Sequence, residues 1–288
     1  MRHTLILLVF ILAILIALPH SSVYAADKEE LFRTISKTSV SAHIVPRYNN
    51  LAVAGDRLHA SAQAYCKDRT AGSFNALHSS FRDYWIAWAG IRHIQFGPIQ
   101  VQNRGFRIQF WPDFRNKTGK QLSRVLAAGD RAALGEETFS KTSIAVQGLP
   151  ALERLLADGH QGFDGAADSF KCALTETIAH NLGRITSDLS AEWNPQDGYA
   201  HIISMAGTQG SPYSEVREVP VELMQGLIAE LEASHDIRLG RPLGAAQEKA
   251  RPKLAEAWRS GLSKAILLES VKSIADIYRN GGLDQASR

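Results

Sequence analysis

The chain has 288 residues, of which 45% are hydrophobic, and its charge is nearly balanced, with 32 Lys and Arg against 29 Asp and Glu. This length is sufficient for a sizeable core in one large domain or two ordinary ones. A formal net charge of +3 provides no basic surface of the kind that binds nucleic acid or an anionic membrane, so we expect neither as a partner.

The first 25 residues are typical of a cleavable secretory signal. Arg2 supplies a positive start, an apolar run of 14 residues covers 5–18, and Val23-Tyr24-Ala25 gives a small-x-small cleavage pattern with a cut near Ala25. Loss of Arg2 leaves 31 basic against 29 acidic side chains. The run is short for a membrane-spanning helix, so the cleaved chain is not expected to be an integral membrane protein. We predict a periplasmic or secreted protein.

Apolar residues at helical spacing predict two helices over 45–67 and 73–92, joined as an antiparallel hairpin. The second helix carries an apolar stripe that ends in Trp85 and Trp88. Aromatic residues at this spacing are expected in the core.

The two cysteines, Cys66 and Cys172, are expected to form one disulfide, because the chain is bound for an oxidising compartment. The bridge would close a loop of about a hundred residues. For such a loop the chain-entropy model gives a stabilisation of about 4 to 5 kcal/mol. Two buried free thiols are the alternative.

The segment 96–117 is the least helical part of the sequence. Phe96-Gly97-Pro98 breaks the preceding helix, and Trp111-Pro112-Asp113 closes the segment. Between them, apolar and polar residues alternate over 106–110, which favours a short extended stretch. A constrained backbone with several charged side chains is a candidate wall of a binding site, and an ordinary ordered loop is the alternative. The charged residues are Arg104, Arg107, Arg115 and Asp113.

Later segments continue the helical pattern. Helices are predicted over 119–133, 164–193, 220–237, 252–258 and 262–278, with a long surface connection over 194–212. No further run of alternating residues suggests strands. The predicted fold class is all-α, in bundle-like layers of antiparallel helices, with the one irregular or extended segment near 96–117.

The stretch from Gly148 to Leu156 is predicted as a tight entry into a short helix that carries one acid. Gly148 lets the backbone turn, and Pro150 suits the first helical position because its missing N–H would have no intrahelical partner there. Glu153 is expected in the first turn, where the helix dipole favours a carboxylate. A capped helix of the core, with no role in a site, is the alternative interpretation of these residues.

The sequence contains no His-Glu-x-x-His pair, no Gly-x-Ser-x-Gly elbow and no Gly-rich phosphate loop. What remains are charged side chains beside helix breaks. We treat His93, Arg107, Asp113 and Glu153 as candidate site residues and expect them to lie close together.

Five stretches resemble the imelysin-like family, which comprises secreted or periplasmic helical proteins related to imelysin-type metallopeptidases and to iron-uptake components. These stretches follow one another in order over nearly all of the mature chain. The resemblance implies two helical bundle-like domains, here 26–145 and 146–288, with a site in the cleft between them. It also implies further helices in relatives, so the second bundle is expected to be truncated. The five stretches are Phe96-Gly97-Pro98, 107–113, 146–153, 241–244 and 257–263.

The family hallmark, Gly-x-His-x-x-Glu, is proposed as a metal or catalytic motif. Gly148 and Glu153 match it, but Pro150 stands at the histidine position. Zinc and iron need several lone-pair donors, and proline has no side-chain donor. The resemblance therefore implies Glu153 as the main site residue, while peptidase activity is not favoured.

Three functions follow as hypotheses. The first is a periplasmic binding or accessory protein for iron or another divalent metal, connected with iron-uptake components, that uses Glu153, Asp113, Arg107 and His93. The second is a metallopeptidase in which Glu153 is the general base and a histidine from elsewhere is recruited. The third is a non-catalytic scaffold or partner-binding protein, in which Glu153 pairs with an arginine.

Overall fold

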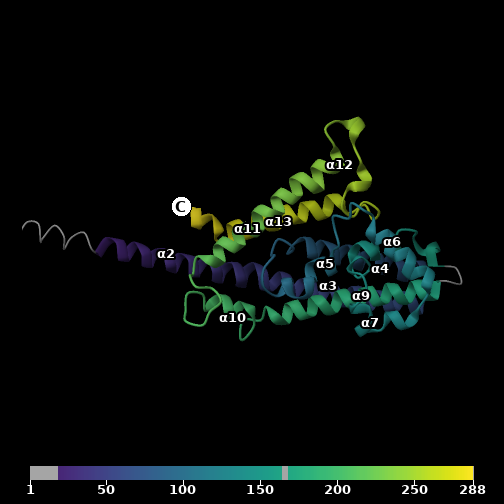
Figure 1. The fold of residues 1–288 in the computed structure, drawn as a ribbon, viewed down its shortest axis with the longest axis horizontal. Coiled ribbons are helices and arrows are strands. Elements are labelled where there is room, and N and C mark those ends of the chain that lie inside the picture. Colours follow the sequence, from purple (N-terminus) through teal and green to yellow (C-terminus); the bar gives the residue numbers. More distant parts are fainter. Residues whose placement is uncertain (1–18, 164–167, 288) are drawn as a thin grey trace, which may run out of the picture.

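The computed structural model describes residues 19–163 and 168–287 (Figure 1). Most of the predicted signal sequence, residues 1–18, lies outside the described residues. Within the described ranges every regular element is helical and no strand occurs, which confirms the all-α prediction. No helix in this part of the chain is both long and apolar enough to cross a membrane.

Two long antiparallel helices, α3 (Val45–Lys67) and α9 (Asp168–Glu192), form the centre of the fold (Figure 1). Helix α4 (Ala71–Ala89) packs along α3 and completes the predicted hairpin. Trp85 and Trp88 on α4 are buried, as predicted.

Helices α3 and α9 are fixed to one another at two levels. The predicted disulfide between Cys66 and Cys172 joins them, with the two Cα atoms 5.6 Å apart. About three turns along α3, Gly55 faces Gly183 so closely that a Cβ on Gly55 would lie 2.8 Å from the Gly183 Cα. A side chain at this crossing would force the helices apart.

The outer helices surround this pair. Helix α2 (Pro19–Thr38) leads through a π-helical turn into α3 and contacts α11 (Glu218–Glu232), while α13 (Ser263–Asn280) contacts α4. Helix α11 leads outward to α12 (Arg241–Leu243), which lies at the tip of the projection in Figure 1. The remaining short helices are α5 (Arg104–Ile108), α6 (Lys117–Ala128), α7 (Glu136–Ser140), α8 (Leu149–Leu156) and α10 (Tyr199–Ser204).

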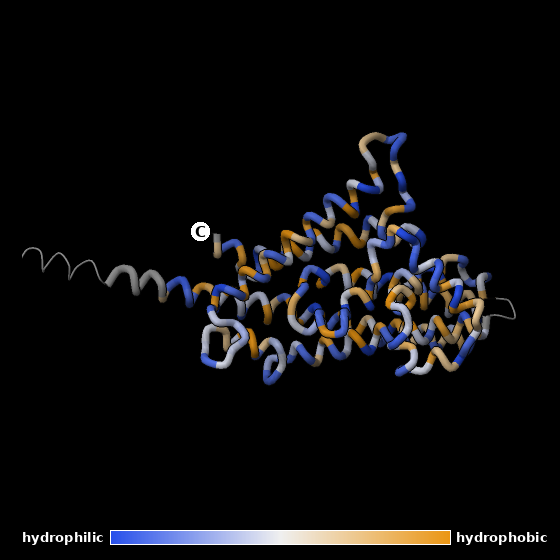
Figure 2. Tube along the Cα trace, in the orientation of Figure 1, coloured by the Kyte–Doolittle hydropathy of each residue, from blue (hydrophilic) through white to orange (hydrophobic). Residues whose placement is uncertain are grey.

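Buried hydrophobic residues from both halves of the chain form one contiguous core cluster. For example, the ring of Tyr48 stacks on that of Trp193 with the centroids 5.7 Å apart. Hydrophobic and hydrophilic residues alternate along the helices, as the shared core requires (Figure 2). The division into domains at residues 145 and 146 stays a prediction.

The segment 96–117 is irregular as a whole, but the extended stretch predicted over 106–110 is wrong in its first half. Gly97–Asn103 forms a 3-10 turn, α5 follows to Ile108, and the chain leaves the helix only at Gln109. The alternating pattern misled because the polar residues are not on an exposed face. Arg107 and Gln109 are buried with hydrogen-bond partners, whereas Phe106 is 55% exposed.

Two other predictions differ from the structure. The predicted connection over 194–212 contains α10. The predicted helix over 252–258 is a 3-10 turn, Pro252–Leu254, followed by irregular turns. The left-handed backbone of Ala257, with φ at 52°, is incompatible with a continuous helix there.

Candidate functional site

Helix α8 begins directly against the backbone of α5. A Cβ on Gly148 would lie 2.3 Å from the carbonyl oxygens of Arg107 and Ile108, so only glycine fits at this position. Pro150 is the second residue of α8, one position after the predicted first one, and still lies in the first turn. This contact fixes the position from which Glu153 extends.

Glu153 lies in the second turn of α8, so the prediction that the dipole of the first turn stabilises it is wrong. The residue is 5% exposed. Its Oε1 accepts one hydrogen bond from the backbone N–H of Ser260 at 3.0 Å and another from the Ser260 hydroxyl at 2.8 Å. The acid therefore links α8 to the turn that precedes α13.

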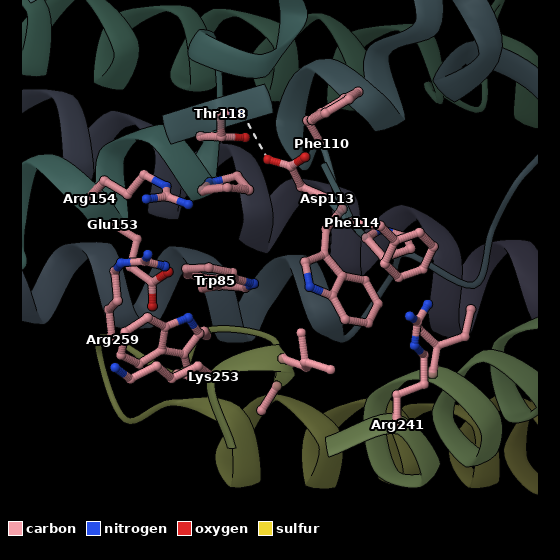
Figure 3. A pocket seen from close by; sticks show the side chains of 18 residues that line it. Trp85, Phe110, Asp113, Phe114, Thr118, Glu153, Arg154, Arg241, Lys253 and Arg259 are labelled. Carbon is pink, nitrogen blue, oxygen red and sulfur yellow. Dashed lines mark hydrogen bonds between the residues drawn. The ribbon is translucent and has the colours of Figure 1, made fainter. Parts of the chain in front are cut away.

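A cavity of about 130 Å³ lies beside Glu153, and we call it the Glu153 cavity (Figure 3). Its lining residues come from both predicted domains and include Trp111, Pro112, Asp113 and Pro150 of the predicted site. Aromatic rings make up much of its wall, contributed by Trp85, Phe110, Phe114 and Trp258.

Cationic side chains outnumber acids around the Glu153 cavity. Three of the cations lie over aromatic rings: the Arg241 guanidinium carbon is 3.8 Å from the ring centroid of Phe114, and the Arg259 guanidinium carbon and Lys253 Nζ are 4.2 and 5.7 Å from that of Trp258. In the part of the chain that the structure describes, none of the cavity cations forms a salt bridge. The cations are Arg154, Arg241, Lys253 and Arg259, and the acids are Asp113 and Glu153.

Both acids of the cavity are already engaged by the protein. Asp113 accepts the backbone N–H of Lys117 at 2.7 Å and that of Thr118 at 2.8 Å, so its carboxylate holds the start of α6 (Figure 3). Glu153 holds Ser260 in the same way. Burial, together with the charge of Arg259, lowers the pKa of Arg154, as expected where cations crowd together. The cavity is therefore electropositive.

His93 and Arg107 do not line the Glu153 cavity. His93 is buried, and its Nε2 lies 3.1 Å from Nε2 of His43. Arg107 is also buried and donates from Nε to the side-chain oxygen of Gln147 at 2.8 Å. The structure thus brings Asp113 and Glu153 to one cavity and places the other two candidates in separate polar contacts.

The sequence reasoning missed a buried ion cluster next to the cavity, formed by Arg92, Glu230, Arg238 and Glu256. Arg92 donates to both acids, and Arg238 donates from Nε to Glu256 at 2.8 Å. Burial raises the pKa of Glu256, but the charges of Arg92 and Arg238 outweigh this effect and hold the pKa below its ordinary value.

One signal for the ion cluster was present in the sequence. Glu230 falls on the same face of α11 as Leu223 and Leu227, which are buried. An acid in an apolar helical stripe needs a buried partner. The pattern does not identify that partner.

The donors around the Glu153 cavity do not fit a metal centre. None of the lining residues is a histidine, Pro150 provides no donor, and each carboxylate already accepts hydrogen bonds from backbone N–H groups. Across residues 19–163 and 168–287, no group of three or more His, Cys, Asp and Glu is arranged to hold a metal ion.

Comparison with known proteins supports the resemblance seen in the sequence. The family profile for imelysin, peptidase family M75, matches residues 44–287. Iron-regulated protein A from Synechococcus elongatus is 21% identical over 236 residues, which are 82% of this chain and 61% of that protein. The chain thus spans about three fifths of the length of this relative.

Two crystal structures share the fold. An imelysin-like protein from Psychrobacter arcticum 273-4 superimposes with a TM-score of 0.72 at 22% identity, over 90% of this chain and 77% of the other. A protein described as an iron-regulated protein A precursor from Parabacteroides distasonis ATCC 8503 gives a TM-score of 0.70 at 14% identity, over 88% and 74%. Because the family profile covers most of its length, the chain belongs to the imelysin family.

Proposed function

We propose that this imelysin-family chain is an exported, iron-related binding protein whose ligand is an anion held in the Glu153 cavity. The charge balance carries the proposal: four cations line the cavity against two acids, and both acids are engaged by the protein. Guanidinium and ammonium groups among aromatic rings suit a carboxylate or phosphate group. The same charges disfavour a bare metal cation.

The connection with iron rests on a relative, which is named iron-regulated protein A. At an electropositive cavity, iron would arrive as an anionic chelate, such as Fe(III) bound by a polycarboxylate, and the protein would contact the chelator. Action beside iron-uptake components belongs to the same proposal. Export to the periplasm is also part of the proposal. It is supported by the predicted signal sequence and by the description of one structural relative as a precursor.

Calorimetry with ferric citrate, citrate and inorganic phosphate tests the proposal. We expect citrate or its iron complex to bind with one-to-one stoichiometry. Arg241→Gln and Arg259→Gln should each weaken binding about tenfold, the effect of losing one charge-assisted hydrogen bond. Arg217→Gln is the control, because Arg217 is 66% exposed, pairs with Glu215 and lies outside the cavity. Failure of all three anions to bind would refute the proposal.

A second candidate function is supported by the contact between Glu153 and Ser260. If this contact is the only task of Glu153, the chain is a scaffold or partner-binding protein and the cavity is a gap between packed segments. A metallopeptidase with a recruited histidine gains no support, because no histidine lines the cavity.

A further inference from the structure

Two neighbouring outer helices, α11 and α13, each carry a row of apolar residues that the fold leaves partly exposed. The helices contact each other and run antiparallel along one edge of the molecule (Figure 1). On each helix the row follows a spacing of 3, 4 and 3 residues, which is the pattern of helices that pack in bundles. Ile228 is 50% exposed and Leu268 is 48% exposed. The rows are Val221, Met224, Ile228 and Leu231 on α11, and Leu268, Val271, Ala275 and Tyr278 on α13.

The two rows lie on the sides of the helices that are directed toward one another. Ala229 and Ala233 line a groove against α5, and the row on α11 lies away from them, because an α-helix has about 3.6 residues per turn. On α13, Glu269 and Asp276 pair with Arg47 on the side that packs on α4, and the row again lies away from them. The two rows therefore form one apolar surface, which we call the α11/α13 face.

The α11/α13 face is not needed to hold the two helices on the molecule. Leu223 and Leu227 bury the inner side of α11, and Ile266 and Ile277 bury the inner side of α13. Two antiparallel helices that share a further apolar face are half of a four-helix bundle. A contiguous apolar surface that remains after the chain has folded is typical of an interaction site.

Unpaired charges beside the α11/α13 face have opposite signs on the two helices. Those on α11 are acids and those on α13 are bases. None of them forms a salt bridge with another residue in the described ranges. A surface that presents both signs on separate helices is complementary to a second copy of itself. The residues are Glu218 and Glu232 on α11, and Lys264, Lys272 and Arg279 on α13.

The positions of these charges select one arrangement of the second copy. Because α11 and α13 are antiparallel, Glu232 at the end of α11 is near the level of Lys264 at the start of α13. Glu218 is likewise near the level of Arg279. A two-fold axis parallel to the helices preserves these levels and places α11 on α13 of the partner subunit, acid against base. A two-fold axis across the helices would place α11 on α11, acid against acid.

We propose that the α11/α13 face binds a second copy of this chain, so that the two pairs of helices form a four-helix bundle with α11 on α13 of the partner subunit. Helices of this length, about 25 Å long and together about 20 Å wide, cover on the order of 500 Å² per copy. The total of about 1,000 Å² is at the lower limit for a specific interface, which favours a dimer in the micromolar range. The interface is separate from the Glu153 cavity and does not depend on its ligand.

Sedimentation velocity on the protein purified after export tests the interface. From about 1 to 200 µM we expect the dimer fraction to rise, with a dissociation constant of about 1 to 100 µM. Ile228→Glu and Val271→Glu should each raise this constant about 100-fold or more, because each places a charge in the apolar centre of the bundle. Val53→Glu is the matched control and should dimerise as the wild type does, since Val53 is 48% exposed on α3.

Charge reversal tests the arrangement with variants that change only exposed side chains. Glu232→Lys should weaken dimerisation about three- to tenfold, because both symmetric contacts then join like charges. Addition of Lys264→Glu restores opposite signs and should return the dissociation constant to within about twofold of the wild type. The proposal is overturned if the wild type is monomeric at about 200 µM, if Ile228→Glu and Val271→Glu dimerise normally, or if Lys264→Glu does not rescue Glu232→Lys.

Discussion

The Glu153 cavity and the ion cluster meet at Trp85, and they differ in how their charged side chains are paired. Trp85 lines the Glu153 cavity and donates its Nε1–H to Glu256 of the ion cluster at 3.3 Å. In the ion cluster, both arginines face carboxylates inside the protein. In the cavity, the cations line the wall without salt bridges, within the described part of the chain. Paired buried charge maintains structure, whereas cations that outnumber the nearby acids and form no salt bridge can bind an anionic ligand.

The largest effect that tests this comparison should come from Glu256→Gln. The substitution leaves Arg92 and Arg238 buried with only Glu230 as a counter-charge. An uncompensated buried charge costs about 3 to 5 kcal/mol, so we expect a loss of this size in the free energy of unfolding. Urea denaturation followed by circular dichroism measures it.

Glu137→Gln is the matched control for Glu256→Gln. Glu137 pairs with Lys141 at the surface, where it is 87% exposed. Its removal should change the free energy of unfolding by less than about 1 kcal/mol. Equal losses in the two variants would mean that the ion cluster does not stabilise the fold as a buried network.

Acid should reveal a second buried structural group, with a smaller effect. Burial and the charge of Arg47 lower the pKa of His43 from 6.5 to about 4, although Asp276 opposes the shift. Between these values the unfolded chain binds a proton that the folded chain does not. Stability is therefore fully present above pH 6.5 and falls as the pH drops from 6.5 toward 4.

Urea denaturation at several pH values measures this dependence. The pKa of Glu256 is held below its ordinary value by Arg92 and Arg238, so a loss of stability that begins near pH 6.5 does not come from this carboxylate. His43→Gln should reduce the loss of stability between pH 6.5 and 4 without abolishing it, because burial also lowers the pKa of the neighbouring His93 well below its ordinary value. A wild-type profile that is already flat there would contradict the assignment.

The central helices were predictable because their signals are local. The apolar spacing over 45–67 gives α3 with the observed bounds, and the expected compartment gives the Cys66–Cys172 bridge. By contrast, the alternation over 106–110 failed because burial of Arg107 and Gln109 depends on distant partners. Periodicity reports the face of an element only when polar residues are on the solvent side.

The candidate site was predictable only in part, for a similar reason. Asp113 and Glu153 share a cavity because Gly148 holds α8 against the carbonyl groups that precede segment 109–113. Lys253 and Arg259 of the cavity come from a 3-10 turn and an irregular turn, where the sequence has no helical period from which the direction of a side chain can be predicted. Nothing near His93 in the sequence indicates that its neighbour is His43, fifty residues earlier.

The smallest effect should come from Glu153→Gln, which most directly separates a binding cavity from a scaffold contact. Glutamine keeps an oxygen that can accept both hydrogen bonds from Ser260 but removes the negative charge. We expect the free energy of unfolding to fall by about 1 kcal/mol, since the hydrogen bonds lose their charge assistance.

If the Glu153 cavity binds an anion, Glu153→Gln should also tighten citrate binding by about two- to fivefold. The substitution removes the repulsion between the carboxylate and the anion, which is worth less than about 1 kcal/mol. Calorimetry on the folded variant measures this change. Lower stability with unchanged citrate affinity would favour the scaffold function, since Glu153 would then act only through Ser260. Loss of binding would contradict both alternatives, because it would make the carboxylate itself a ligand contact. The sign of the change in affinity thus decides what Glu153 does.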